Sequence, residues 1–303
     1  MQPTVVAVPT ARRVPWPAEP VPELPEVETV RRGLASRVVG RRVEHVEVGR
    51  ERTVRRTSRE ALIAGLTDTT IVSADRRGKY LLCPLDSGET LMIHLRMSGR
   101  VLVVPAGSPR PPHTHVAVRL AGAPSRQPEE LWFVDPRTFG EVVVYDPDRV
   151  ALELPELARL GVDPIAEEFT RRQLRRLLRT RSRQLKQFLL DQHLVAGIGN
   201  IYADEILHAA RLRPQRPSDS LSTTAEARLH TAVLGVLNAA IEAGGSTLRD
   251  AQYVDLFGSG GSYQEAHRVY GRGGERCLTC GVGWVRRIVV AQRSTHYCAR
   301  CQR

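Results

Sequence analysis

The chain of 303 residues lacks several features that would place it in common protein classes. It has no run of 18 consecutive apolar residues, so we expect no membrane-spanning helix. No internal repeat and no secretory signal segment is recognisable, and the missing signal favours a cytoplasmic, reducing location. With 42% hydrophobic residues, a chain of this length can bury the cores of two domains and a small third one.

Lysine is almost absent, although the chain is strongly basic. Lys and Arg total 44 against 33 Asp and Glu, a formal net charge of +11, and all of these cations except Lys79 and Lys186 are arginine. A guanidinium suits bidentate phosphate contacts better than an ammonium does. The balance therefore favours a polyanionic partner, with nucleic acid first. A GC-rich coding bias also raises arginine content, so charge alone does not decide the matter.

Cysteine is scarce and unevenly distributed. Four of the five cysteines lie in the last 27 residues as two C-x-x-C pairs, namely Cys277, Cys280, Cys298 and Cys301. This spacing predicts a tetrahedral four-thiolate site for one structural zinc ion per chain. Two disulfides are the alternative, but they require an oxidising compartment. Cys83 lies in a strand-like segment, and we expect it to be buried without a chemical role.

The rest of the sequence begins with a proline-rich leader and continues with a β-rich part. Residues 1–20 contain five prolines and no periodic pattern, so we expect them to be disordered or untranslated. A helix is expected from Pro25, with an apolar stripe that ends at Val38. Strand-like runs follow and predict a β-sandwich or barrel, near residues 43–48, 70–75, 79–85, 90–95, 100–104, 115–120, 131–134 and 142–145.

From about residue 151 the pattern becomes helical. Helices are predicted at residues 170–179, 183–191, 200–211 and 222–243. Ser222 is expected to cap the last of these, and Gly244-Gly245 to end it. A glycine-rich loop at 257–262 then precedes the cysteine pairs, and it fits a mobile lid and a plain linker equally well.

Six segments occur in one order along the chain and carry a resemblance. They are Pro22–Glu28 (PELPEVE), Arg76–Leu82 (RRGKYLL), His94–Gly99 (HLRMSG), Asp135–Gly140 (DPRTFG), Gly197–Glu205 (GIGNIYADE) and Ala291–Cys298 (AQRSTHYC). With these motifs, the chain from Pro22 to Gln302 resembles the formamidopyrimidine-DNA glycosylases. These are bifunctional base-excision enzymes that remove oxidised purines and then nick the strand.

The resemblance implies an α+β multidomain fold for a monomeric protein that binds damaged double-stranded DNA. It places a catalytic β-sandwich domain with a flanking helix at residues 22–150, after an extension at 1–21. A helix–two-turn–helix domain with a glycine-rich lid follows at 151–262, and a zinc finger at 263–303. The DNA is expected in the cleft between these parts.

The resemblance also implies four catalytic residues. Pro22, as an N-terminal secondary amine, is the expected nucleophile at C1′ of the deoxyribose, because a free α-amine is partly neutral at physiological pH. Glu23 is the expected acid–base group. Lys79 is expected to assist elimination. Arg293 is expected on the phosphates that flank the lesion, where we favour charge stabilisation over proton donation because its pKa is high.

DNA-binding residues carry over in the same way. Met97, Arg137 and Phe139 match the side chains that fill the space left by an extruded nucleotide. Asn200 and Lys186 match phosphate contacts, whereas His113 and either Arg181 or Arg183 are weaker matches. Arg96 stands where the family often has glycine, and it fits either an added phosphate contact or an altered loop approach.

One departure from the family pattern concerns the start of the chain. If Met1 is the true start, Pro22 is an internal imide and cannot form a Schiff base. Val21 stands where the family has its initiator methionine, and a GUG codon encodes valine internally but methionine at initiation. We therefore expect the active chain to begin at Pro22.

Three other functions compete with this one. The endonuclease VIII branch of the superfamily acts on oxidised pyrimidines, but Leu24 and Phe139 favour the purine branch. A catalytically silent DNA-binding paralogue is expected if Pro22 is not N-terminal. A zinc-ribbon transcription factor is a distant third, since it has no need of the PELPEVE segment.

Overall fold

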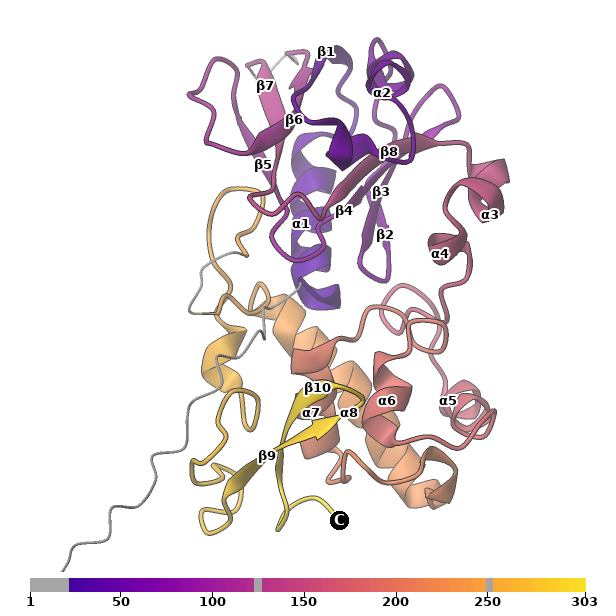
Figure 1. Ribbon diagram of the computed structural model, residues 1–303, viewed down its shortest axis with the longest axis vertical. Coiled ribbons are helices and arrows are strands. Elements are labelled where there is room, and N and C mark those ends of the chain that lie inside the picture. Colours follow the sequence, from indigo (N-terminus) through magenta and orange to yellow (C-terminus); the bar gives the residue numbers. More distant parts are fainter. Residues whose placement is uncertain (1–21, 123–126, 249–252) are drawn as a thin grey trace, which may run out of the picture.

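The computed structural model describes residues 22–122, 127–248 and 253–303 (Figure 1). The leader expected to be disordered lies outside these residues. The first described element is α1 (Leu24–Arg37), which begins directly after Pro22 and Glu23. Its predicted apolar stripe of Val27, Val30, Leu34 and Val38 is fully buried.

Two four-stranded antiparallel sheets form the β-sandwich domain that the sequence predicts. The first has the order β1-β6-β7-β5, with β1 (Val43–Val48), β5 (Arg100–Pro105), β6 (Thr114–Leu120) and β7 (Glu129–Val134). The second has the order β2-β3-β4-β8, with β2 (Asp75–Arg77), β3 (Tyr80–Pro84), β4 (Thr90–His94) and β8 (Glu141–Tyr145). Inward-facing side chains of both sheets, such as Val46 and Leu81, share one core with α1.

One predicted strand is wrong. Residues 70–74 form only isolated bridges, Thr70 with Arg42 beside the first sheet and Ile71 with Leu85 beside the second, and Asp75 alone belongs to a strand, as the first residue of β2. The segment crosses from one sheet to the other, so it cannot pair with either along its length. Helix α2 (Arg59–Leu66) was not predicted from the sequence; it begins at a Ser58 cap whose hydroxyl accepts the Ala61 amide at 3.0 Å.

The helical domain contains the four helices expected from periodicity. They are α5 (Arg171–Leu178), α6 (Leu185–Leu190), α7 (Asn200–Ala209) and α8 (Thr223–Glu242). The predicted ends of α8 are confirmed: the Ser222 hydroxyl accepts the Ala225 amide at 3.3 Å, and Gly244 and Gly245 have φ of 72° and 82°. Among the described residues, no helix is both long and apolar enough to cross a membrane.

Short helices fill the connections. They are η1 (Glu51–Val54), η2 (Pro147–Arg149), α3 (Val150–Glu153), α4 (Pro155–Ala158), η3 (Ser218–Ser220) and η4 (Tyr263–Ala266). Leu154 and Leu157 pack with Met92 and Val143 of the second sheet. This short helical segment therefore packs against the β-sandwich, and the domain boundary expected at residue 151 stays a prediction.

The C-terminal ribbon is a hairpin of β9 (Val285–Val290) and β10 (Arg293–Cys298). Its two turn residues, Ala291 and Gln292, have φ of 49° and 59°, as a type I′ turn requires. Figure 1 shows the hairpin at the end of the molecule opposite the sandwich, with β10 against α7. Arg293 directly follows this turn and is the first residue of β10.

Candidate active site and zinc centre

A cavity of about 1060 Å³ lies where the sandwich, the helical domain and the ribbon meet. Six of the predicted catalytic and DNA-binding residues line it, although they come from six separate stretches of chain. They are Glu23, Lys79, Met97, Phe139, Asn200 and Arg293. Pro22 is buried beside Glu23 and is not among the lining residues.

The Glu23 carboxylate is buried at the N-terminus of α7. It accepts the amides of Gly199 and Ile201, both at 2.8 Å, and that of Tyr202 at 3.3 Å. Burial raises the pKa of Glu23, whereas the nearby Lys79 charge and these three amides lower it in part. A Cβ on Gly199 would lie 2.3 Å from the carboxylate carbon, so only glycine leaves room for Glu23 here.

A second buried carboxylate, Glu26, belongs to the site but was missed by the sequence analysis. Its oxygens accept the Glu23 amide at 2.9 Å, the Ser246 amide at 2.7 Å and the Tyr202 hydroxyl. Burial and the neighbouring Glu23 charge raise the pKa of Glu26 to about 7. Glu26 is the third residue of α1, a position whose side chain normally faces solvent while it caps the helix. Its burial results from the packing of α1 against α7, which a local sequence pattern does not show.

Lys79 lies in the two-residue turn between β2 and β3. Gly78 has φ of 58°, which suits the first central residue of a tight hairpin turn. Burial lowers the pKa of Lys79, with the charges of Glu23 and Glu26 opposing that effect and Arg293 adding to it. The lysine is therefore easier to deprotonate than a surface lysine, as a group that accepts or relays protons requires.

His94 is another cavity residue that the sequence analysis did not assign. Its Nδ1 accepts the Arg96 amide at 3.1 Å, so the neutral ring carries its proton on Nε2 and is a donor there. Burial and the Arg96 charge lower the pKa of His94 to about 3. A neutral N–H donor in the cavity is suited to donate a hydrogen bond to an oxygen of the DNA backbone.

Arg96 has φ of 52°, a left-handed conformation that glycine adopts without strain. Its guanidinium reaches the buried Glu141 at 2.9 Å, where Arg55 and Arg56 also bind. Burial acts to raise the pKa of Glu141, but Arg56 and Arg96 outweigh it and lower the pKa to about 2. The cluster gives one edge of the cavity a positive charge.

The three expected wedge residues come from two neighbouring loops. Met97 and Phe139 line the cavity, and the Arg137 guanidinium lies 4.9 Å from the centre of the Phe139 ring. The Asp135 carboxylate shapes the second loop by accepting the amides of Arg137 at 3.2 Å and Gly140 at 2.7 Å. All three side chains are partly exposed rather than in the core.

Lys186, expected to contact a phosphate, does not face the cavity in this structure, and its contact with DNA stays a prediction. The side chain is fully buried, and its ammonium donates to Asp204 Oδ1 at 2.6 Å and to the Ser294 carbonyl at 2.9 Å. In this arrangement the donors of the ammonium are used within the protein. Asp204 Oδ2 also accepts the His296 amide at 2.8 Å, so the pair ties α7 to the strand that begins with Arg293.

The remaining phosphate candidates differ in exposure. Asn200 begins α7 and lines the cavity, and Arg181 and His113 are exposed, the latter outside the cavity. Arg183 forms an ion pair of 2.5 Å with Asp191. Their contacts with DNA stay predictions.

The glycine-rich loop at 257–262 does not line the cavity. Leu256 packs into the sandwich core, and its carbonyl accepts the Val103 amide at 3.1 Å. The Asp255 carboxylate accepts the amides of Phe257 at 2.9 Å and Ser259 at 2.8 Å. In this arrangement the segment connects helical domain and sandwich, and its action as a lid stays a prediction.

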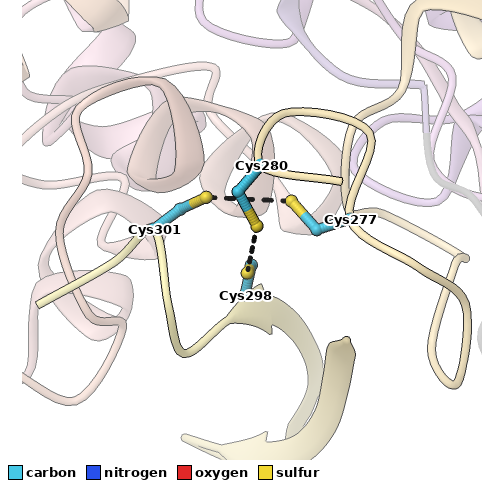
Figure 2. A group of neighbouring side chains, drawn as sticks. All are labelled: Cys277, Cys280, Cys298 and Cys301. Atoms are coloured by element: carbon cyan, nitrogen blue, oxygen red, sulfur yellow. Dashed lines mark hydrogen bonds between the residues drawn. The ribbon is translucent and has the colours of Figure 1, made fainter. Parts of the chain in front are cut away.

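The four C-terminal cysteines form a compact cluster (Figure 2). Their sulfurs lie within 4.8 Å of one another, with Cys277 and Cys301 at 3.8 Å and Cys280 and Cys298 at 3.9 Å. Zinc–sulfur bonds of about 2.3 Å place tetrahedral sulfurs roughly 3.8 Å apart, whereas a disulfide is about 2.05 Å long. The spacing fits one zinc ion and not two disulfides.

The backbone around the cluster also suits a metal. The amides of Val282 and Gly283 lower the pKa of the Cys280 thiol to about 6, which favours the thiolate that zinc requires. A Cβ on Gly283 would lie 2.8 Å from the Cys298 sulfur. With four cysteine ligands the coordination is complete, so the zinc is structural.

Comparison with known families and proteins gives matches over nearly the whole described chain. Residues 21–142 match the formamidopyrimidine-DNA glycosylase N-terminal domain, 160–252 the H2TH domain of the same enzymes, and 274–303 a zinc finger found in FPG and IleRS. Formamidopyrimidine-DNA glycosylases of Salinispora arenicola and Roseiflexus sp. are 44% and 42% identical, over 93% of this chain and 96% and 100% of theirs.

Solved structures agree. The Lactococcus lactis Fpg in complex with Fapy-dG-containing DNA has a TM-score of 0.81 and 37% identity, over 93% of this chain and 100% of that one. Its complex with abasic-site DNA has the same TM-score and identity, over 93% and 99%. The chain therefore belongs to the formamidopyrimidine-DNA glycosylase family.

Proposed function

We propose that this protein excises oxidised purines, namely 8-oxoguanine and formamidopyrimidines, from double-stranded DNA and then cleaves the abasic strand. The observation that carries the proposal is the cavity in which Glu23, Lys79 and Arg293 converge from the three parts of the chain. The Lactococcus lactis relative has been solved with Fapy-dG-containing DNA and with abasic-site DNA, which are the substrate and the intermediate of such a reaction.

Base excision begins at the Pro22 nitrogen. The neutral secondary amine attacks C1′, the glycosidic bond breaks, and its electron pair leaves with the base, which takes up a proton. The amine loses its proton, and opening of the sugar ring leaves an iminium ion between Pro22 and C1′. Glu23 moves protons between these atoms, because its raised pKa keeps it closer to neutral pH than an exposed carboxyl.

Strand cleavage follows from the iminium ion. The cation acidifies the C2′ proton, and its removal expels the 3′ phosphate by β-elimination; a second elimination then expels the 5′ phosphate. Lys79 is placed to accept or relay a proton, since it lines the cavity near Glu23. Arg293 stabilises charge on the flanking phosphates.

Extrusion of the damaged nucleotide leaves a gap in the duplex. Met97 and Phe139 are suited to replace the lost stacking, and Arg137 to bind the base left opposite. The neutral His94 and the side chain of Asn200, at the start of α7, offer donors for phosphate, since the neighbouring α7 amides are bound to Glu23. The zinc ion keeps the hairpin folded so that Arg293 faces the cavity, and it takes no part in the chemistry.

This mechanism requires a free amine at Pro22. The N-terminal family model matches from residue 21, and 93% of this chain spans all of the Roseiflexus relative. Both observations support an active form that begins at Pro22.

Borohydride trapping tests the proposal directly. Two proteins are compared on duplexes with 8-oxoguanine or an abasic site: the chain of residues 1–303, and a chain whose mature N-terminus is Pro22. The second should yield a covalent DNA adduct and strand cleavage, and the first should yield neither. Pro22→Gly, kept N-terminal, should retain part of the activity because it still offers an amine. Equal adduct formation by both proteins would contradict the assignment of Pro22, and cleavage by neither would indicate a silent DNA-binding paralogue.

A further inference from the structure

Asp163 lies at the interface between the helical domain and the sandwich, and its carboxylate is fully buried. One oxygen, Oδ2, accepts the Gly78 amide at 2.8 Å and Arg76 Nη1 at 2.5 Å. The other, Oδ1, accepts Arg76 Nη2 at 3.2 Å, so carboxylate and guanidinium meet as two parallel forks. Asp163 is not among the described residues that line the cavity.

These contacts hold the turn that carries Lys79. The Gly78 amide donates to Asp163, and the Gly78 carbonyl accepts Arg76 Nη1 at 2.8 Å, so both backbone groups of the residue before Lys79 are bound. A Cβ on Gly78 would lie 3.2 Å from the Ala196 Cβ, which shows how closely the turn packs against the helical domain. The second domain therefore sets the position of the Lys79 backbone.

The segment that contains Asp163 also holds the loop that binds Glu23. The Val162 carbonyl accepts the Ala196 amide at 2.9 Å, and Val162 forms a parallel bridge with Val195. Three residues after Ala196, the Gly199 amide donates to the Glu23 carboxylate. Residues 162–163 are thus bound on one side to the Lys79 turn and on the other to the Glu23 loop.

We infer that Asp163 is a positioning residue for Lys79. It fixes the Lys79 turn relative to the Glu23 carboxylate across the domain interface, and it affects strand cleavage only through Lys79. The inference rests on the proposed function, in which Lys79 assists elimination. Asp163 lies outside the cavity, but it aligns Lys79 with Glu23 inside the cavity.

The test compares four proteins that begin at Pro22: wild type, Asp163→Asn, Lys79→Ala and the double variant. The rate of strand cleavage is measured on abasic-site DNA under single-turnover conditions. Asp163→Asn should slow cleavage by about 10- to 100-fold, since a shift of about 1 Å in a catalytic group has effects of this size. The double variant should cleave within about twofold of Lys79→Ala, because the position of an absent ammonium cannot matter. The affinity of Asp163→Asn for uncleaved DNA should stay near that of wild type.

Multiplication of the two effects in the double variant would overturn the inference, because Asp163 would then act independently of Lys79. A wild-type rate for Lys79→Ala would overturn it as well, by removing the role of Lys79. Failure of the proposed function can be told apart from failure of this inference, because the wild-type protein would then form no covalent adduct in the borohydride trapping experiment.

Asp204→Asn is the matched control. Asp204 is equally buried and also paired with a cation, but it holds the ribbon strand instead of the Lys79 turn. Its effect should multiply with that of Lys79→Ala. If Asp163→Asn does not fold, Arg76→Lys replaces it, because lysine keeps the charge beside Asp163 but loses the forked contact. The same criterion then applies to the double variant with Lys79→Ala.

Discussion

Replacement of Glu26 by glutamine should change how the stability of the protein depends on pH. Burial and the Glu23 charge raise the pKa of Glu26 from 4.5 to about 7 in the folded protein. The folded pKa lies above the unfolded one, so this group's contribution to stability is fully present below pH 4.5 and is lost as pH rises to 7. At about 1.4 kcal/mol per pH unit, the loss amounts to about 3 kcal/mol.

The assay is reversible urea unfolding of wild type and Glu26→Gln between pH 5.5 and 8.5, where zinc remains bound better than in more acidic buffer. About 2 of the 3 kcal/mol falls in this window for a pKa that rises from 4.5 to about 7. Glutamine stays neutral, and its carbonyl can still accept from Tyr202 or Ser246. The variant should therefore be less stable than wild type at pH 5.5 and should recover about 2 kcal/mol relative to it by pH 8.5.

Tyr202→Phe is a second variant for the same assay, and it should increase the pH-dependent loss of stability that Glu26→Gln removes. The Tyr202 hydroxyl donates to Glu26 and lowers its pKa, so its removal should raise the pKa further and enlarge the pH-dependent loss. The reasoning is refuted if the stability difference between wild type and Glu26→Gln is constant across the window. Glu26 would then be ionised at every pH, held so by its three donors in spite of burial.

Three other outcomes follow from the site geometry. Gly199→Ala should slow base excision by about 100-fold with little loss of DNA affinity, because its Cβ displaces the Glu23 carboxylate; a wild-type single-turnover rate would show that Glu23 acts elsewhere. Arg293→Ala should keep one zinc ion per chain but reduce the salt dependence of binding to abasic-site DNA by about one phosphate contact. An unchanged slope of log affinity against log salt concentration would show that Arg293 does not contact a phosphate. Cys298→Ala should lose zinc and DNA affinity while the sandwich stays folded, and full zinc content in this variant would contradict the four-cysteine site.

The local parts of this protein could be predicted from the sequence because each depends on neighbouring residues. Alternation of apolar side chains identified seven of the eight sandwich strands in the positions where the structure has them, and the 3.6-residue period identified α1, α5, α6, α7 and α8. The cysteine spacing predicted the zinc site. The strand expected at 70–75 failed because its residues pair with both sheets, and pairing partners are not visible in a local pattern.

By itself, the sequence therefore determined the order of elements, the zinc ligands, the family and six of the residues that line the cavity. Only the tertiary structure decided the electrostatic state of those residues. Glu23 meets amides 176 to 179 positions away, Glu26 is buried by α7, and Lys186 pairs with Asp204 inside the protein. The reason is that desolvation and charge pairing depend on what packs around a group, and those neighbours come from other domains.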